Sequence, residues 1–188
     1  MLIKEDNKMK KFIVIILVLV SVGGMYYFSS QDGQVSKNQS QAVVNLIDKV
    51  RDKVTLQDEN LIKIQTKVYD KLKGFGDKRY IVRKMAHFSI YALIGTALLL
   101  FIYVFSKKLI LSSLIATILS IMYAIYDEKR QLSIPGRYGT MKDVFIDSYG
   151  ALTGIILTFT IILIIKIIIF IVKKILNKNK LHKSEFNK

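Results

Sequence analysis

The stretch AHFSIYALIGTALLLFIYVF, residues 86–105, decides the fold class of this chain. It contains no Lys, Arg, Asp or Glu along its whole length. The hydrocarbon core of a bilayer is about 30 Å thick, so a spanning helix needs roughly 20 apolar residues. A soluble domain would instead distribute its apolar residues at the period of a helix or a strand. The stretch therefore predicts a membrane-spanning helix.

Three further apolar blocks predict three more spans, at about residues 12–28, 109–126 and 148–165, and the last could run on to Val172. Aromatic residues follow the first block in place of a small-x-small cleavage pattern, so we predict an uncleaved anchor helix. Charged residues fall between the blocks. We therefore predict an all-α integral membrane protein whose four-helix transmembrane bundle lies within residues 12–172.

The charge of the chain indicates what surrounds it. The 188 residues include 29 Lys and Arg against 14 Asp and Glu, a net charge of +15, and 52% are hydrophobic. The basic residues gather beside the apolar spans, which favours membrane lipid over nucleic acid as the partner. The chain has no Cys, which excludes disulfides and thiolate metal sites.

A polar loop, residues 29–85, separates the first two spans and carries two amphipathic stretches. Their apolar residues recur every three or four positions: Val43, Ile47, Val50 and Val54, then Leu61, Ile64, Val68 and Leu72. This spacing predicts two helices with one apolar face each, lying on the membrane surface. The alternative is that the two helices pack on each other above the bundle.

The placement of Lys and Arg predicts the orientation. The basic lead, residues 1–11, the loop at Lys107 and Lys108, and the Lys-rich tail, residues 173–188, all fall on one side of a four-span chain. Short basic segments stay in the cytoplasm. We therefore predict a multi-pass membrane protein with both termini cytoplasmic, although Lys78 to Lys84 place positive charge on the outer side.

The remaining polar residues gather at the predicted outer face. They are Arg83, Lys84 and His87 before the second span, Asp127, Glu128, Lys129, Arg130 and Gln131 after the third, and Arg137, Asp143 and Asp147 around the start of the fourth. Lys84 lies at a helix N-terminus and Glu128 at a C-terminus, so each has the wrong sign for its helix dipole. We expect Arg83 or Lys84 to approach Asp127, Glu128 or Asp147, near hydrocarbon where unpaired charge is costly.

Spacing within these groups supports one site, but structural roles compete. Lys84, His87 and Tyr91 share a helical face, as do Asp143 and Asp147, while Gly150 and Gly154 predict close helix packing. Alternatively, Thr140 and Asp143 form a capping box that only starts a helix. Residues 127–130 could equally be a solvated loop of mixed charge, and His87 a hydrogen-bonded interfacial residue.

These residues also carry a family resemblance. RKMAHF at 83–88 with Tyr91 and Gly95, Asp127–Glu128 with Gln131 and Pro135–Gly136–Arg137, and Asp143 with Asp147 and Gly150 resemble three motifs of the VanZ-like membrane proteins. Ser29, Ser30 and Gln31, with Ser36 and Ser40, resemble the stretch after that family's first helix. The stretch 43–76 is long for the family. The resemblance implies a bacterial inner-membrane protein and a link to low-level resistance to the glycopeptide teicoplanin, but no reaction.

Two function hypotheses follow, and the sequence leaves open whether the chain is an enzyme. In the first, it acts on a lipid-linked or lipid-like envelope substrate such as a cell-wall precursor. The candidate catalytic residues are His87, Asp127, Glu128 and Asp147, and the candidate substrate- or phosphate-binding residues are Arg83, Lys84, Gln131, Arg137 and Asp143. The carboxylates would act as a base or hold a divalent cation. In the alternative, the same residues bind a lipid head group or the antibiotic without turnover. A transporter is less favoured, because the spans carry almost no charge.

Overall fold

The computed structural model describes residues 2–55 and 76–186, with isolated positions between them, and every regular element in this part of the chain is an α-helix. The helices are α1 (Leu2–Ser29), α2 (Gly33–Thr55), α4 (Lys78–Ser106), α5 (Leu109–Gln131) and α6 (Met141–Phe186). Four of them are long and apolar enough to cross a membrane. The predicted all-α membrane bundle is therefore confirmed.

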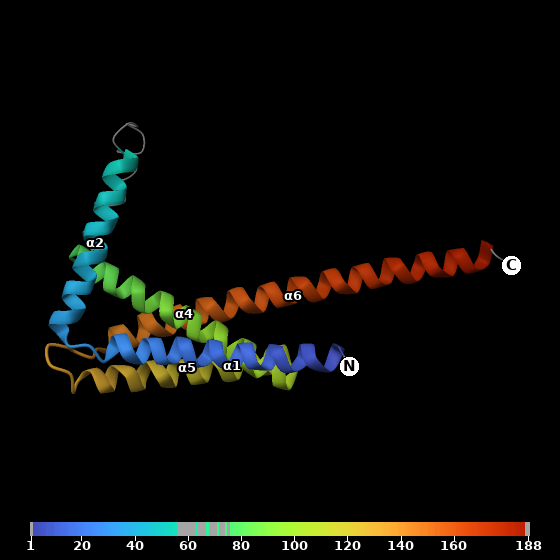
Figure 1. Ribbon diagram of the computed structural model, residues 1–188, viewed down its shortest axis with the longest axis horizontal. Coiled ribbons are helices and arrows are strands. Elements are labelled where there is room, and N and C mark those ends of the chain that lie inside the picture. The colour runs from blue at the N-terminus through green and yellow to red at the C-terminus, as the bar shows by residue number, and fades with distance from the viewer. Residues whose placement is uncertain are drawn as a thin grey trace.

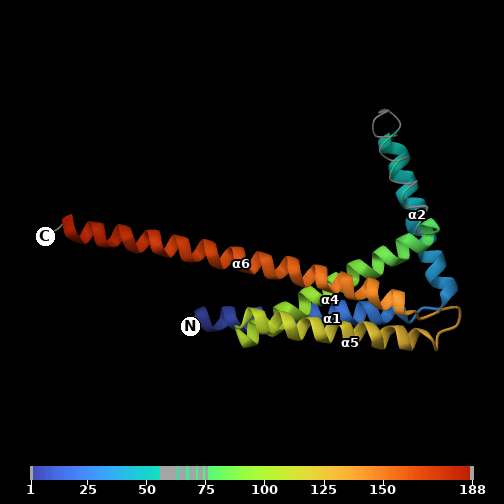
Figure 2. The same ribbon diagram turned by 180° about the vertical axis from the view of Figure 1, so that it is seen from behind.

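The four apolar helices come together near the start of α6, and α6 then diverges from the others, as Figures 1 and 2 show from opposite sides. Helix α4 packs against α1, α5 and α6 and so forms the centre of the bundle. Helix α6 begins beside α4 and continues well past the other helices, while α2 leaves the bundle at the end opposite the N-terminus. This end brings together the C-terminal ends of α1 and α5 and the first turns of α4 and α6.

Glycine permits the close packing of α4 on α6. A Cβ atom on Gly150 would overlap the carbonyl of Phe88, and one on Gly154 would overlap the carbonyl of Ala92. Across the same contact, the Thr96 hydroxyl donates a hydrogen bond of 3.2 Å to the Gly154 carbonyl. Small residues four apart allow helix backbones to approach in this way inside membranes. The approach brings the first turns of α4 and α6 into contact.

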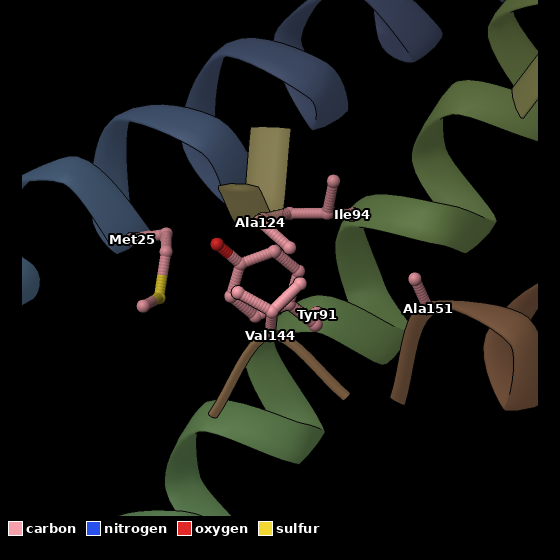
Figure 3. Close-up of a cluster of buried hydrophobic side chains, with 6 residues drawn as sticks. All are labelled: Met25, Tyr91, Ile94, Ala124, Val144 and Ala151. Carbon is pink, nitrogen blue, oxygen red and sulfur yellow. The ribbon is translucent and has the colours of Figure 1, made fainter. Parts of the chain in front are cut away.

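A small apolar cluster holds the four helices together beneath their polar ends. Figure 3 shows its members: Met25, Tyr91, Ile94, Ala124, Val144 and Ala151. Tyr91 is fully buried at the centre and is contributed by α4. The other members come from α1, α5 and α6 as well as α4, so the cluster fixes all four helices against each other.

At the other end of the bundle, Lys side chains lie on aromatic rings, a pattern typical of a membrane boundary. The ammonium group of Lys11 lies 5.1 Å from the centre of the Phe105 ring, and that of Lys166 lies 5.0 Å from the centre of the Tyr103 ring. At 1.5 Å per residue, Asp147 lies about 28 Å along α6 from Lys166. That length matches the hydrocarbon core of about 30 Å. This distance favours a placement of the polar helix ends at the opposite boundary.

Helix α2 is longer than the predicted amphipathic stretch that it contains. Val43, Ile47 and Val50 are exposed on it, as a helix lying on a membrane surface requires. An ion pair of 3.1 Å between Asp48 and Lys78 ties α2 to the start of α4. The second amphipathic stretch, Leu61 to Leu72, lies outside the described residues, so packing between the two stretches stays a prediction.

Candidate functional site

Polar side chains fill the end of the bundle where four helices converge. Among the predicted site residues, His87, Asp127, Glu128, Gln131, Arg137, Asp143 and Asp147 are each at most 9% exposed. They come from α4, α5, α6 and the loop between α5 and α6. Buried polar groups need partners, so the network of contacts separates structural roles from available chemistry.

Asp127 has a full set of partners. It accepts hydrogen bonds from the Ser29 hydroxyl at 2.8 Å and the Gln131 amide at 3.0 Å. Arg130 forms an ion pair with it at 2.7 Å, and the Arg130 guanidinium lies 4.2 Å from the centre of the Tyr26 ring. These contacts join the end of α1 to the end of α5. Asp127 therefore anchors two helices and has little capacity left for chemistry.

Arg137 is committed to the backbone in a similar way. Its guanidinium donates to the carbonyls of Phe28 at 2.9 Å and Gln31 at 3.0 Å. The last carbonyls of a helix lack partners within the helix, so Arg137 caps α1 from the α5–α6 loop. Burial lowers the pKa of Arg137, and the positive charge of Arg83 lowers it further. Arg137 thus holds the loop on α1.

The start of α6 is capped by residues from two helices. The Thr140 hydroxyl accepts a hydrogen bond of 3.2 Å from the Asp143 backbone N–H, as the predicted capping box requires. The backbone N–H of Thr140 donates to a Glu128 carboxylate oxygen at 3.0 Å, so Glu128 takes the role expected of Asp143. The Asp143 carboxylate instead forms an ion pair with Lys84.

No ion pair among the described residues joins the basic group to Asp127, and the expected approach of Arg83 or Lys84 to Asp127, Glu128 or Asp147 stays a prediction. Asp127 forms an ion pair with Arg130, which lies one turn further along the same helix. Lys84 forms an ion pair with Asp143, because the close packing of α4 on α6 places these two side chains together. Lys84 and Asp127 therefore each have a partner of opposite sign, but they are not partners of each other.

One carboxylate at the centre, that of Asp147, has no hydrogen-bond partner among the described residues. Asp147 is 1% exposed, and both of its carboxylate oxygens are buried. His87 Nδ1 lies 3.5 Å from Asp147 Oδ1, beyond hydrogen-bond length. One ligand atom each from His87, Glu128 and Asp147 lies within 4.8 Å of the others. The Tyr91 hydroxyl, one turn along α4 from His87, is unpartnered too. This trio could hold a metal ion or a polar substrate group.

Arg83 takes part in a separate feature. It lines a pocket of about 190 Å³ together with Lys37, Ser40, Asp77, Arg79 and Tyr80. The pocket lies between α2 and the start of α4, and three of its six lining residues are basic. Arg83 has no carboxylate partner in the described part of the chain. Its guanidinium lies 5.8 Å from the centre of the Tyr80 ring.

The sequence singled out polar residues that converge at this end of the bundle, but not how they pair with one another. Arg130 could have been found as the partner of Asp127, because residues three apart on a helix are neighbours. The pairing of Ser29 with Asp127 spans 98 residues and has no local signal. The use of the Thr140 N–H by Glu128 is equally non-local.

Comparison with known proteins places the chain in a family. The model of the VanZ/LLP1 family matches residues 12–172, which includes every span and every residue of the polar site. No curated protein and no solved structure matches the chain. The chain is therefore a multi-pass membrane protein of the VanZ/LLP1 family.

Proposed function

We propose that the chain is an enzyme that acts on a lipid-linked or lipid-like substrate at the outer face of the bacterial plasma membrane. The observation that carries this proposal is Asp147, a buried carboxylate with no partner for either oxygen, beside His87 and Glu128. An unpaired buried charge is costly near hydrocarbon and is retained where function needs it. A bonded carboxylate such as Asp127 carries no such cost.

The depth of this trio suits a substrate anchored in lipid. It lies about one hydrocarbon thickness from the Lys-marked boundary, at the level of the opposite head groups. A lipid-linked molecule would present its polar part there while its chains stay in the bilayer. His87 would serve as acid or base, and Glu128 or Asp147 as the base that activates water. Hydrolysis or transfer through water is the reaction class that these groups support.

The basic pocket is the best place for an anionic part of the substrate. Lys84 and Arg137, which the sequence also offered as phosphate ligands, are bonded within the protein. Arg83 has no ion-pair partner within the described residues and shares its pocket with Lys37, whereas Arg79 in the same pocket is paired with Asp77. The planar guanidinium pairs two phosphate oxygens at once. We therefore assign phosphate contact to Arg83.

The same pocket also favours a second candidate, a protein that binds an anionic head group or a glycopeptide such as teicoplanin without turnover. The decisive experiment is a comparison of lipids and cell-wall precursors between a deletion strain and its parent. An enzyme predicts that one species accumulates on deletion and returns to normal on complementation. A binding protein predicts changed teicoplanin susceptibility with an unchanged precursor pool. If deletion caused neither accumulation of a species nor a change in teicoplanin susceptibility, both proposals would be contradicted.

A further inference from the structure

We infer that His87, Glu128 and Asp147 bind one divalent transition-metal ion between α4, α5 and α6. The inference deepens the proposed function, on which its physiological role rests, by naming what occupies the centre of the site. Metal binding itself is measurable without knowledge of the reaction.

The three residues have the geometry of a site that closes on an ion. Each comes from a different helix, and their nearest ligand atoms lie within 4.8 Å of one another. Three atoms bound to one tetrahedral ion at about 2.1 Å lie about 3.4 Å from one another. A bound ion would therefore draw the side chains inward by up to roughly 0.8 Å each, which small rotamer adjustments provide.

The hydrogen bonds leave the required atoms available. Both oxygens of Asp147 and Nδ1 of His87 are buried and unpartnered among the described residues. Glu128 is held in place from outside, by the Thr140 N–H on one oxygen at 3.0 Å and the Gln131 amide on the other at 3.1 Å. Outer contacts of this kind orient the carboxylate that binds a metal.

The charges of the buried carboxylates point to the same occupant. Asp127 is neutralised by Arg130, and Asp143 by Lys84. Glu128 and Asp147 have no Lys or Arg partner within the described part of the chain. Arg137 donates instead to two backbone carbonyls and to Gln131. A divalent cation would balance the two remaining charges and satisfy the atoms that lack hydrogen bonds.

The ligand set selects the class of ion. One imidazole nitrogen with two carboxylates suits Mn²⁺, Fe²⁺ or Zn²⁺, whereas Mg²⁺ and Ca²⁺ prefer oxygen ligands alone. The chain has no Cys, so a softer thiolate site is excluded. Mn²⁺ is the most informative probe, because its paramagnetism reports directly on the atoms bound to it.

The test uses the full chain purified in lipid nanodiscs and titrated with Mn²⁺. We expect about one Mn²⁺ per chain, with a nitrogen coupling in its electron paramagnetic resonance spectrum that disappears in His87→Gln and with displacement of Mn²⁺ by Zn²⁺. Changing an outer contact alone typically weakens metal affinity about 10–100-fold. Asp147→Asn and Glu128→Gln remove direct ligands, so we expect a loss of more than about 100-fold. Asp143→Asn, one turn away on the same helix, is the matched control and should keep close to the original affinity.

Two outcomes would overturn the metal site. One is a folded protein that binds neither Mn²⁺ nor Zn²⁺ more tightly than Asp147→Asn does, which would leave a metal-free His87–Asp147 pair. The other is equal loss of affinity in Asp143→Asn, which would indicate diffuse attraction to acidic residues. Thermal unfolding of each variant separates loss of the site from loss of the fold. Failure of metal binding would leave the precursor analysis as an independent test of the proposed function.

Discussion

Two buried aspartates at the same end of the bundle have opposite surroundings. Asp127, at the α1–α5 contact, is bonded to Ser29, Arg130 and Gln131. Asp147, at the α4–α6 contact, has no hydrogen bond on either oxygen among the described residues. Both are at most 1% exposed. Burial therefore does not distinguish a functional carboxylate from a structural one here, whereas the hydrogen-bond partners do.

The largest effect is expected on activity at the unpartnered aspartate. Asp147→Asn removes a candidate base while breaking no hydrogen bond, so activity should fall by at least about 100-fold, as loss of acid–base catalysis typically causes. Stability should be unchanged or higher, because an uncompensated buried charge is lost. The measurement is complementation of a deletion strain beside quantified membrane protein and its unfolding temperature. Adding Glu128→Gln should cause no further loss, because members of one catalytic unit are not additive. Full activity at normal protein level would refute the site.

The bonded aspartate should give the reverse pattern. Asp127→Asn removes one charge of a mostly buried ion pair and places an amide against the donors Ser29 and Gln131. We expect a loss of about 2–4 kcal/mol in the free energy of unfolding. Activity per folded molecule should be largely retained, so activity should follow the protein level. A stable but inactive Asp127→Asn would contradict the contrast between the two aspartates.

The helix contact beneath Asp147 should respond to a single methyl group. Gly154→Ala places a Cβ atom on the Ala92 carbonyl and should cost about 1–3 kcal/mol by overpacking. Gly23→Ala is the matched control, because a Cβ there meets nothing within 4 Å, and it should be neutral or slightly stabilising. Unfolding temperatures of the two variants in detergent measure the difference. Equal stability would mean that α4 and α6 are not in the tight contact described.

The smallest expected effect on the protein comes from single-cysteine labelling, which tests which membrane face holds the site. Single cysteines at Gln41 on α2 and at Lys107 between α4 and α5 lie on opposite sides of the bundle, and the chain has no native Cys. With cytoplasmic termini, a membrane-impermeant thiol reagent should label Gln41→Cys in intact cells and Lys107→Cys only after permeabilisation. Neither substitution should affect stability. The opposite labelling pattern would place the two aspartates at the cytoplasmic face.

The sequence by itself determined the fold class and the neighbourhood of the site. Apolar length and the position of charges along the chain are one-dimensional properties, so the four spans and the polar residues at their ends could be read directly. The spacing of Gly150 and Gly154 likewise indicated a close helix contact, and both glycines pack against α4 backbone carbonyls.

Only the tertiary structure decided which charges pair and which remain available. Asp127 meets Ser29 across 98 residues, and Arg137 meets Phe28 across 109. Such pairings depend on the rotation and separation of the packed helices, which no local pattern encodes. Because α6 packs closely on α4, Asp143 forms an ion pair with Lys84, while Asp147 lies beside His87 without a hydrogen bond. Three-dimensional packing thus gives different surroundings to Asp143 and Asp147, although they lie four residues apart on one helical face.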